Sequence, residues 1–282
     1  AASLPGIWVS VVIRQHTSPP SIRHGEYNPG HAVPPYTLDP WRASMKRMLT
    51  PLFLLPLLLG HSLAAWGQST AAPMHIPDTM AQRMLACSAC HGPEGRATNE
   101  GFFPRIAGKP AGYIYNQLIN FRDGRRVYPA MTRLIDPLSD AYLKEISTYF
   151  AGLDLPYPAP LRSTASAQDM ARGETLAKKG DARLDIPACT ECHGDALTGQ
   201  GDTIPGLLGL PADYVKKQLG SWRTHQRKAA VPDCMASVAR RLPVADIEAV
   251  VHWLSAQPLP AHTKAPPMLA KKLPMDCGSA KP

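Results

Sequence analysis

The chain has 282 residues, of which 44% are hydrophobic and 18% are charged, and its formal net charge is +8. This length accommodates two domains of about 100 residues each, with further segments beside them. No apolar run beyond residue 60 is long enough to span a bilayer, which excludes a protein with several membrane spans.

The first 67 residues are expected to lie outside the folded domains. Residues 1–44 are rich in Pro, Ser and His without a sustained helical or strand period, and we assign them to a non-native or disordered leader. Residues 45–67 follow the order of a secretory signal peptide, with two basic residues, an apolar run over 49–59 and then small residues. A retained membrane anchor is the alternative, although a run of about eleven residues is short for a bilayer. The sequence therefore predicts export to the periplasm.

A short helix is predicted over residues 79–89, and it leads into the pentapeptide Cys87-Ser88-Ala89-Cys90-His91. The spacing Cys-x-x-Cys-His is that of a c-type haem attachment site. Cys87 and Cys90 can form thioethers with the two vinyl groups of one porphyrin, and His91 then lies under the iron as its proximal ligand. The alternatives are a zinc ribbon or a redox dithiol that happens to be followed by histidine.

The residues after this motif supply two further candidates. Pro104 lies 13 residues beyond His91, where its carbonyl can accept a hydrogen bond from the imidazole, although a rigid turn also explains it. Met131, 40 residues after His91, is the only methionine between this haem motif and the linker, and it is the candidate for the second axial ligand. We place it in a loop between two helices predicted over 111–123 and 139–153.

The same pattern recurs about 100 residues later, after a proline-rich linker over 154–166. The offset is 102 at the haem motifs, 101 from the prolines onward and 104 from the methionines onward. The second copy contributes Cys189, Cys192, His193, Pro205 and Met235, with helices predicted over 169–179, 212–223 and 244–256. Because the repeat covers more than the motifs, we predict two domains, each with one covalent haem c.

His/Met ligation has a chemical consequence at each iron. A thioether favours ferrous over ferric iron, so the reduction potential rises, and two filled axial positions discourage the binding of oxygen or peroxide. Met131 and Met235 would be ordinary apolar fillers in the alternative interpretation. Their matching positions in the repeat favour ligation at both irons by the pairs His91/Met131 and His193/Met235.

Other repeated positions allow two interpretations each. Arg122 and Arg223 either pair with haem propionates or lie exposed at helix ends. Four aromatic residues either line the haems or pack in the helical cores: Tyr113, Tyr149, Tyr214 and Trp253.

Two haems also alter the charge balance. Residues 1–67 hold five of the 30 basic and two of the 22 acidic residues, so the rest of the chain has a net charge of +5. Four ionised propionates reduce this to about +1, which argues against a nucleic-acid partner. Five basic residues cluster in the second half: Lys216, Lys217, Arg223, Arg227 and Lys228. A docking patch for an acidic redox partner or anionic lipid is one interpretation, and a solvated helix face is the other.

Cys234 and Cys277 lie outside the haem motifs. In an oxidising compartment a disulfide between them would attach the C-terminal tail beside Met235. Two free thiols are the alternative, and a third is Cys234 as a haem ligand in place of Met235, which would break the repeat and lower the potential.

Residues 78–258 resemble the diheme cytochrome c4 family. The segments that carry the resemblance are Ala86-Cys-Ser-Ala-Cys-His-Gly, Phe103-Pro-Arg-Ile-Ala-Gly, Tyr128-Pro-Ala-Met and Ile186-Pro-Ala-Cys-Thr-Glu-Cys-His-Gly. The resemblance implies two class I cytochrome c domains related by a pseudo-twofold, with their haems close together, in a periplasmic carrier that serves terminal oxidases. The cysteine pair, Pro243 at the start of the last helix and the tail after Pro258 depart from the family pattern.

We therefore expect an all-α protein with domain 1 at 68–153, the linker at 154–166, domain 2 at 167–258 and a C-terminal tail at 259–282. The predicted function is electron transfer without catalysis, from a quinol:cytochrome c reductase or a dehydrogenase to a terminal oxidase, with peripheral membrane association as an option. The alternative is the haem subunit of a periplasmic dehydrogenase acting on alcohol, sulfide or thiosulfate. A diheme peroxidase is a weaker candidate because it needs an open iron, and a haem-based gas sensor is weaker still because the sequence shows no output domain.

Overall fold

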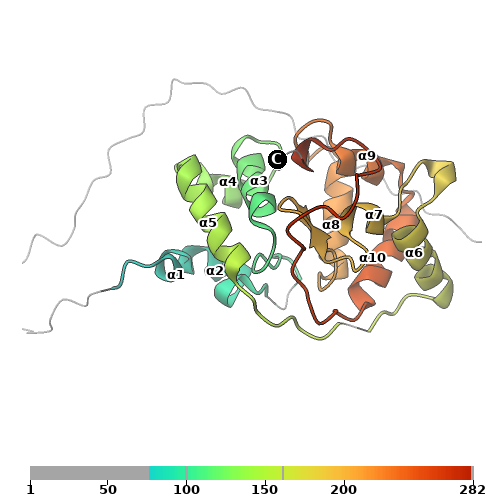
Figure 1. Ribbon diagram of the computed structural model, residues 1–282, viewed down its shortest axis with the longest axis horizontal. Coiled ribbons are helices and arrows are strands. Elements are labelled where there is room, and N and C mark those ends of the chain that lie inside the picture. The colour runs from blue at the N-terminus through green and yellow to red at the C-terminus, as the bar shows by residue number, and fades with distance from the viewer. Residues whose placement is uncertain (1–75, 99–100, 161, 281–282) are drawn as a thin grey trace, which may run out of the picture. The chain divides into compact units, whose positions relative to one another are not determined.

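The computed structural model describes residues 76–98, 101–160 and 162–280, and its regular elements are almost all helices (Figure 1). The predicted leader and signal peptide lie outside the described residues. In the first repeat, residues 76–153, the elements are α1 (Met80–Arg83), α2 (Leu85–His91), the 3-10 turn η1 (Pro93–Gly95), α3 (Ala111–Arg122), α4 (Pro129–Ile135) and α5 (Asp140–Gly152). In the part of the chain that the structure describes, no helix has the length and apolar character needed to cross a membrane.

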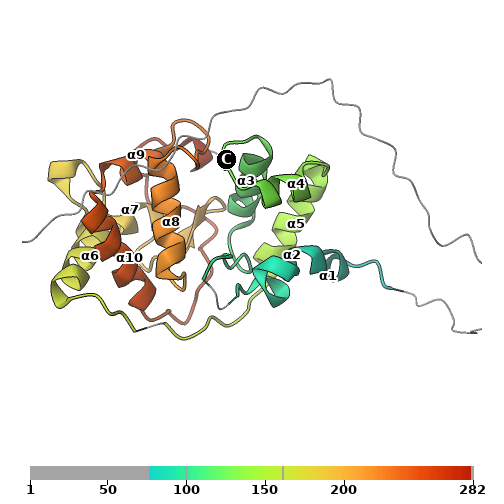
Figure 2. The same cartoon turned by 180° about the vertical axis from the view of Figure 1, so that it is seen from behind.

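The second repeat, residues 167–258, has a similar order of helices (Figure 2), with a longer first helix, a 3-10 turn before the haem-motif helix rather than after it, and two short strands. Its elements are α6 (Ala167–Lys179), η2 (Ala182–Leu184), α7 (Cys189–His193), β1 (Gly199–Gln200), β2 (Ile204–Pro205), α8 (Ala212–Arg223), α9 (Cys234–Arg241) and α10 (Val244–Ala256). A final 3-10 turn, η3, spans Gly278–Ala280. The all-α fold is confirmed, whereas the domain bounds stay a prediction.

Local sequence explains where the long helices begin. Ser139 Oγ accepts a hydrogen bond from the backbone N–H of Tyr142 at the start of α5, and Ser166 Oγ accepts one from Asp169 at the start of α6. Such caps satisfy backbone donors that the first helical turn leaves without partners. The predicted bounds of α3, α5, α6, α8 and α10 agree with the structure to within two residues.

Besides the break at Met84, which divides the helix predicted over 79–89 into α1 and α2, two features differ from the sequence-based expectation. Met131 and Met235 lie in short helices, α4 and α9, rather than in loops. Pro129 occupies the first turn of α4, where its missing N–H costs nothing, and Asp233 caps α9, so both segments start a helix despite their short length. The second difference is the antiparallel pair β1 and β2, whose two-residue strands are too short to produce an alternating pattern.

Each repeat buries its own apolar core. In the first, Leu143, Ile146 and Phe150 of α5 lie on one face of the helix and pack with residues of α3. In the second, α10 packs against α6, and a Cβ atom at Gly173 would lie only 2.3 Å from the carbonyl oxygen of Ala249. Glycine therefore allows α6 and α10 to cross closely beside the haem motif.

Candidate haem sites

Both motif histidines are buried and held in the same way. His91 ends α2 and lies 2.8 Å, through Nδ1, from the carbonyl oxygen of Pro104. His193 ends α7, and its Nδ1 lies 2.7 Å from the carbonyl oxygen of Pro205. Since a carbonyl can only accept, each Nδ1 carries the proton and each Nε2 presents its lone pair. Burial lowers the pKa of both imidazoles, which keeps them neutral and able to bind a metal ion.

The backbone turns sharply after each histidine. Gly92 and Gly194 follow the two histidines with φ of 75° and 80°, a region that side chains with a Cβ atom rarely adopt. A Cβ atom at Gly92 would also lie 2.2 Å from the carbonyl oxygen of Ala97. The turn brings the following segment back toward the imidazole, and so the proline carbonyl reaches Nδ1.

Three of the four motif cysteines lie in surroundings that favour the thiol over the thiolate. Burial raises the pKa of Cys189 to about 11, and it also raises the pKa values of Cys87 and Cys192. A redox dithiol needs a lowered pKa at its attacking cysteine, which is the opposite of the shift at these three residues. A structural zinc site needs four ligands, and among the described residues no group of three or more Cys, His, Asp or Glu side chains converges.

Each candidate methionine packs in the core that contains the first cysteine of its own motif. Met131 of α4 and Cys87 border the apolar core of the first repeat, and Met235 of α9 and Cys189 border that of the second. Both methionines are partly buried. The fold thus brings a thioether from a late helix into the same core as the attachment motif, and axial ligation itself stays a prediction.

Cys234 and Cys277 are joined by a disulfide in the structure, with their Cα atoms 5.0 Å apart. A cysteine in this bond has no thiolate to offer to iron, so Cys234 does not compete with Met235 as a ligand. Cys234 is the first residue of α9 and immediately precedes Met235.

The two repeats meet in a network of hydrogen bonds with matching partners. The guanidinium of Arg126 donates to the Oε1 atoms of Gln117 (3.0 Å) and Gln218 (2.7 Å). Arg227, its counterpart at the offset of 101, donates to the same two oxygens at 2.9 and 2.8 Å. The backbones of the two arginines form an antiparallel bridge. This exchange of equivalent partners is what a pseudo-twofold relation between the repeats produces.

Comparison with known proteins agrees with this arrangement. The "Thiosulfate dehydrogenase electron acceptor" of Thiomonas intermedia is 39% identical over 175 residues, which cover 62% of this chain and 79% of that protein. Cytochrome c4 of Pseudomonas aeruginosa is 32% identical over 74% of this chain and 98% of its own. No family model matches. The crystal structure of reduced recombinant cytochrome c4 from Pseudomonas stutzeri superposes with a TM-score of 0.54 at 30% identity, over 62% of this chain and 95% of that one.

The chain belongs to the diheme cytochrome c4 family. It is therefore an electron-transfer cytochrome with covalently bound haem c rather than a catalytic enzyme. A periplasmic location is typical of this family.

The residues of this cytochrome c4 chain fit haem c in more than the attachment motif. Trp222 of α8 buries its indole Nε1, which has no hydrogen-bond partner among the described residues. The Arg227 guanidinium lies 3.9 Å from the centre of the same indole ring, and it is buried. A buried donor without an acceptor is costly, and so is a buried cation without a counter-charge. The carboxylate of a haem propionate accepts hydrogen bonds and carries a negative charge. It therefore has the acceptor that Trp222 Nε1 needs and the counter-charge that Arg227 needs.

Sequence analysis did not single out these interface residues and gave weight to others. Arg122 pairs with Asp140 and Asp123, and Arg223 donates to backbone carbonyls at the end of α9, so both half-buried arginines have protein partners, and pairing with propionates stays a prediction. The signal for Arg126 and Arg227 was present in the repeat at the offset of 101. The position of Arg227 near Lys216, Lys217, Arg223 and Lys228 in the sequence favours a basic cluster instead.

That cluster is not one exposed patch. Arg227 is only 5% exposed, and Lys216 forms an ion pair with Glu248. The ammonium of Lys217 lies 3.8 Å from the ring centre of Phe102 in the first repeat. Of the aromatic set, Tyr214 and Trp253 belong to the buried core of the second repeat, while Tyr113 and Tyr149 border that of the first.

Proposed function

We propose that this protein carries two haem c groups and transfers electrons in the periplasm from a dehydrogenase to a terminal oxidase. The observation that carries the proposal is the repetition of one arrangement, in which a buried neutral imidazole is held through Nδ1 by a proline carbonyl and precedes a thioether in the same core. One haem would be attached through Cys87 and Cys90, and the other through Cys189 and Cys192.

In this proposal the haem supplies an iron that alternates between ferrous and ferric states. The chain keeps the ligands in place through both states, since each imidazole is held by a backbone carbonyl and each thioether by a packed core. A site with unchanging ligands reorganises little on oxidation. Two sites in one chain also make transfer between them intramolecular, which suits a relay or the storage of two electrons.

We further propose that the donor is a thiosulfate-oxidising dehydrogenase. The relative from Thiomonas intermedia, which is named as the electron acceptor of such an enzyme, supports this choice. A quinol:cytochrome c reductase is the second candidate donor, supported by the match to cytochrome c4 of Pseudomonas aeruginosa, which is longer although lower in identity. The proposal includes a Cys234–Cys277 disulfide in the exported protein and removal of the signal peptide over 45–67.

A kinetic comparison of the two donors tests the choice. The oxidised protein is mixed in a stopped-flow instrument either with a thiosulfate dehydrogenase and thiosulfate or with a quinol:cytochrome c reductase and quinol, and haem reduction is followed spectroscopically. Faster reduction by the dehydrogenase at equal enzyme concentration is expected, with no reduction when thiosulfate is omitted. Reduction by the quinol enzyme alone would contradict the proposed donor without affecting the electron-transfer function.

A further inference from the structure

The residues after α10 form a long segment that contacts both repeats. Residues 259–280, here called the C-terminal strap, run from the end of α10 back to α9 (Figures 1 and 2). Within the second repeat, the N–H of Gly201 donates to Pro266 O at 2.8 Å. Toward the first repeat, Lys264 Nζ donates to Gly152 O at 3.2 Å, and Asn116 Nδ2 donates to Ser279 O at 3.3 Å. Both repeats therefore bind the strap by a few polar contacts.

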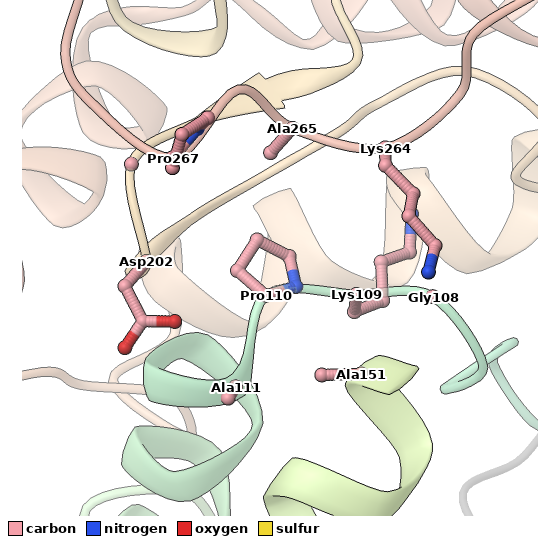
Figure 3. Close-up of a pocket in the computed structure, with 10 residues that line it drawn as sticks. Gly108, Lys109, Pro110, Ala111, Ala151, Asp202, Lys264, Ala265 and Pro267 are labelled. Atoms are coloured by element: carbon pink, nitrogen blue, oxygen red, sulfur yellow. The ribbon is translucent and has the colours of Figure 1, made fainter. Parts of the chain in front are cut away.

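Hydrophobic burial holds the strap only weakly. Leu259 at its start packs against the core of the second repeat, but no strap residue is fully buried, and Met268 and Leu269 are 78% and 41% exposed. Between Lys264 and Pro267 it passes over a pocket of about 250 Å³ (Figure 3). A segment with little buried area and few hydrogen bonds opens at low free-energy cost, so a covalent attachment decides whether it stays.

That attachment is made next to a proposed iron ligand. The Cys234–Cys277 disulfide closes a sequence separation of 43 residues, and Cys234 immediately precedes Met235 in the first turn of α9. Beside it, the N–H of Gly278 donates to Pro232 O at 2.9 Å. A Cβ atom at Gly278 would lie 2.3 Å from Val231 O, so the end of the strap packs directly on the backbone that leads into α9.

The strap also reaches the attachment motif of the same repeat. Gln200 is 1% exposed, and its Nε2 donates to the carbonyl of Cys192 at 2.8 Å. The N–H of Ala270 in the strap donates to Oε1 of the same glutamine at 3.1 Å. One segment thus bridges the helix that carries the haem cysteines and the helix that carries the methionine.

The first repeat has no such bond. Ala130 occupies the position of Cys234 at the offset of 104, and it precedes Met131 in α4. Cys234 and Cys277 are the only cysteines outside the two haem motifs, so no disulfide of this chain can hold α4. A disulfide therefore attaches α9, which carries Met235, to the strap, whereas α4, which carries Met131, has no such bond.

We propose that the C-terminal strap, locked by the Cys234–Cys277 disulfide, is a positioning device for Met235. It holds the Met235 thioether in place for the second haem iron, whereas α4, which carries Met131, is held by core packing and by hydrogen bonds such as that from Thr132 Oγ1 to Phe121 O at 3.0 Å. This inference rests on the proposed ligation by Met235.

The test uses the full-length holoprotein with Cys277→Ala, Cys234→Ala and the double variant. Carbon monoxide binding to the ferrous protein reports an iron whose methionine has left, and the ferric methionine-to-iron absorption band and the potential of each haem give independent readouts. We expect apparent carbon monoxide affinity at the second haem to rise about tenfold or more, with the first haem unchanged. The double variant should equal the single variants, because each removes the same bond.

Two further measurements keep the test decisive. Gly278→Ala leaves both cysteines in place and pushes the strap from the Val231 carbonyl, so it should raise carbon monoxide binding at the second haem by a smaller factor. Thiol labelling of the denatured wild type should modify neither Cys234 nor Cys277. Labelling of both, unchanged carbon monoxide binding in every variant, or equal loss of ligation at both haems would each overturn the inference. If Met235→Ala leaves the wild-type spectrum intact, the ligand assignment fails instead.

Discussion

At each haem motif, one hydrogen bond determines which imidazole nitrogen is free to bind iron. The proline carbonyl fixes the proton on Nδ1 of His91 and His193, and burial keeps both rings neutral. The motif spacing predicts the histidine as a ligand, and the proline positions in the repeat predict its partner. The second axial ligand is predicted to be methionine, and a single substitution can test this role.

Replacing Met131 or Met235 by alanine should open one iron and leave the other closed. Loss of the thioether removes a ligand that favours ferrous iron, so the reduction potential of that haem should fall and the iron should bind carbon monoxide. Redox titration with absorption spectra gives both readouts. An unchanged spectrum in either variant would refute that ligand, and the untouched haem in each variant serves as the control.

Asp181 predicts a pH dependence of stability. Hydrogen bonds from Arg183 and Arg172 lower the pKa of this buried carboxyl to about 2, below its ordinary value of 3.8. The folded state therefore holds the charged form more strongly than the unfolded state does, and the gain is present above about pH 4 and lost as the pH falls to about 2. Urea unfolding of the wild type and Asp181→Asn should differ at pH 6 and converge near pH 2. A difference that persists at pH 2 would contradict this explanation.

At the scale of elements, the crossing of α6 and α10 depends on one glycine. Gly173 lies where a Cβ atom would be 2.3 Å from Ala249 O and 2.6 Å from Cβ of Trp253. Backbone atoms cannot move aside as a flexible side chain can, so the helices themselves would have to separate. The crossing supports the haem motif of the second repeat, because α6 also packs against α7.

Gly173→Ala should therefore lower the free energy of unfolding by about 1–3 kcal/mol. The matched control is Gly220→Ala in α8, where nothing lies within 4 Å of the added Cβ atom, and there alanine should leave stability unchanged or raise it by up to about 1 kcal/mol. Chemical denaturation followed by circular dichroism measures both. Equal effects of the two substitutions would show that helix propensity, and not the crossing, controls stability.

At the scale of the whole molecule, Arg126 and Arg227 connect the repeats through the side chains of Gln117 and Gln218. The backbone bridge between the arginines adds the hydrogen bond from Val127 N to Gln226 O at 2.8 Å. Because these groups are partly or fully buried, an unpaired partner costs more than the hydrogen bond itself contributes. The network therefore couples the unfolding of the two repeats.

Arg227→Met should weaken this coupling. We expect the variant to unfold in two calorimetric transitions where the wild type unfolds in one. The destabilisation should be about 1–3 kcal/mol, because the amide oxygens of Gln117 and Gln218 each lose one of their two arginine donors. Lys228→Met, at the neighbouring exposed position, is the control and should unfold as the wild type does. A single transition in Arg227→Met would show that other contacts hold the repeats together.

Haem attachment and the repeated long helices could be predicted from residues that are near neighbours in the chain. Cys87, Cys90 and His91 lie within five consecutive residues, and their counterparts in the second repeat do too. The spacing alone therefore predicts haem attachment. The long helices were predictable for a similar reason, since their apolar period and caps are properties of adjacent residues. The methionine segments were placed correctly along the chain but assigned to loops, because a seven- or eight-residue helix carries too little periodic signal.

Which of the repeated arginines is buried depends on contacts that form only in the folded protein. Arg122, Arg126, Arg223 and Arg227 all recur in the repeat, and their difference arises from where the two repeats meet. The course of residues 259–280 was likewise beyond prediction, because a segment without period or buried residues is placed by scattered contacts with distant backbone. Local spacing controls bonds between near neighbours in the chain, whereas burial and pairing depend on surfaces that exist only after folding.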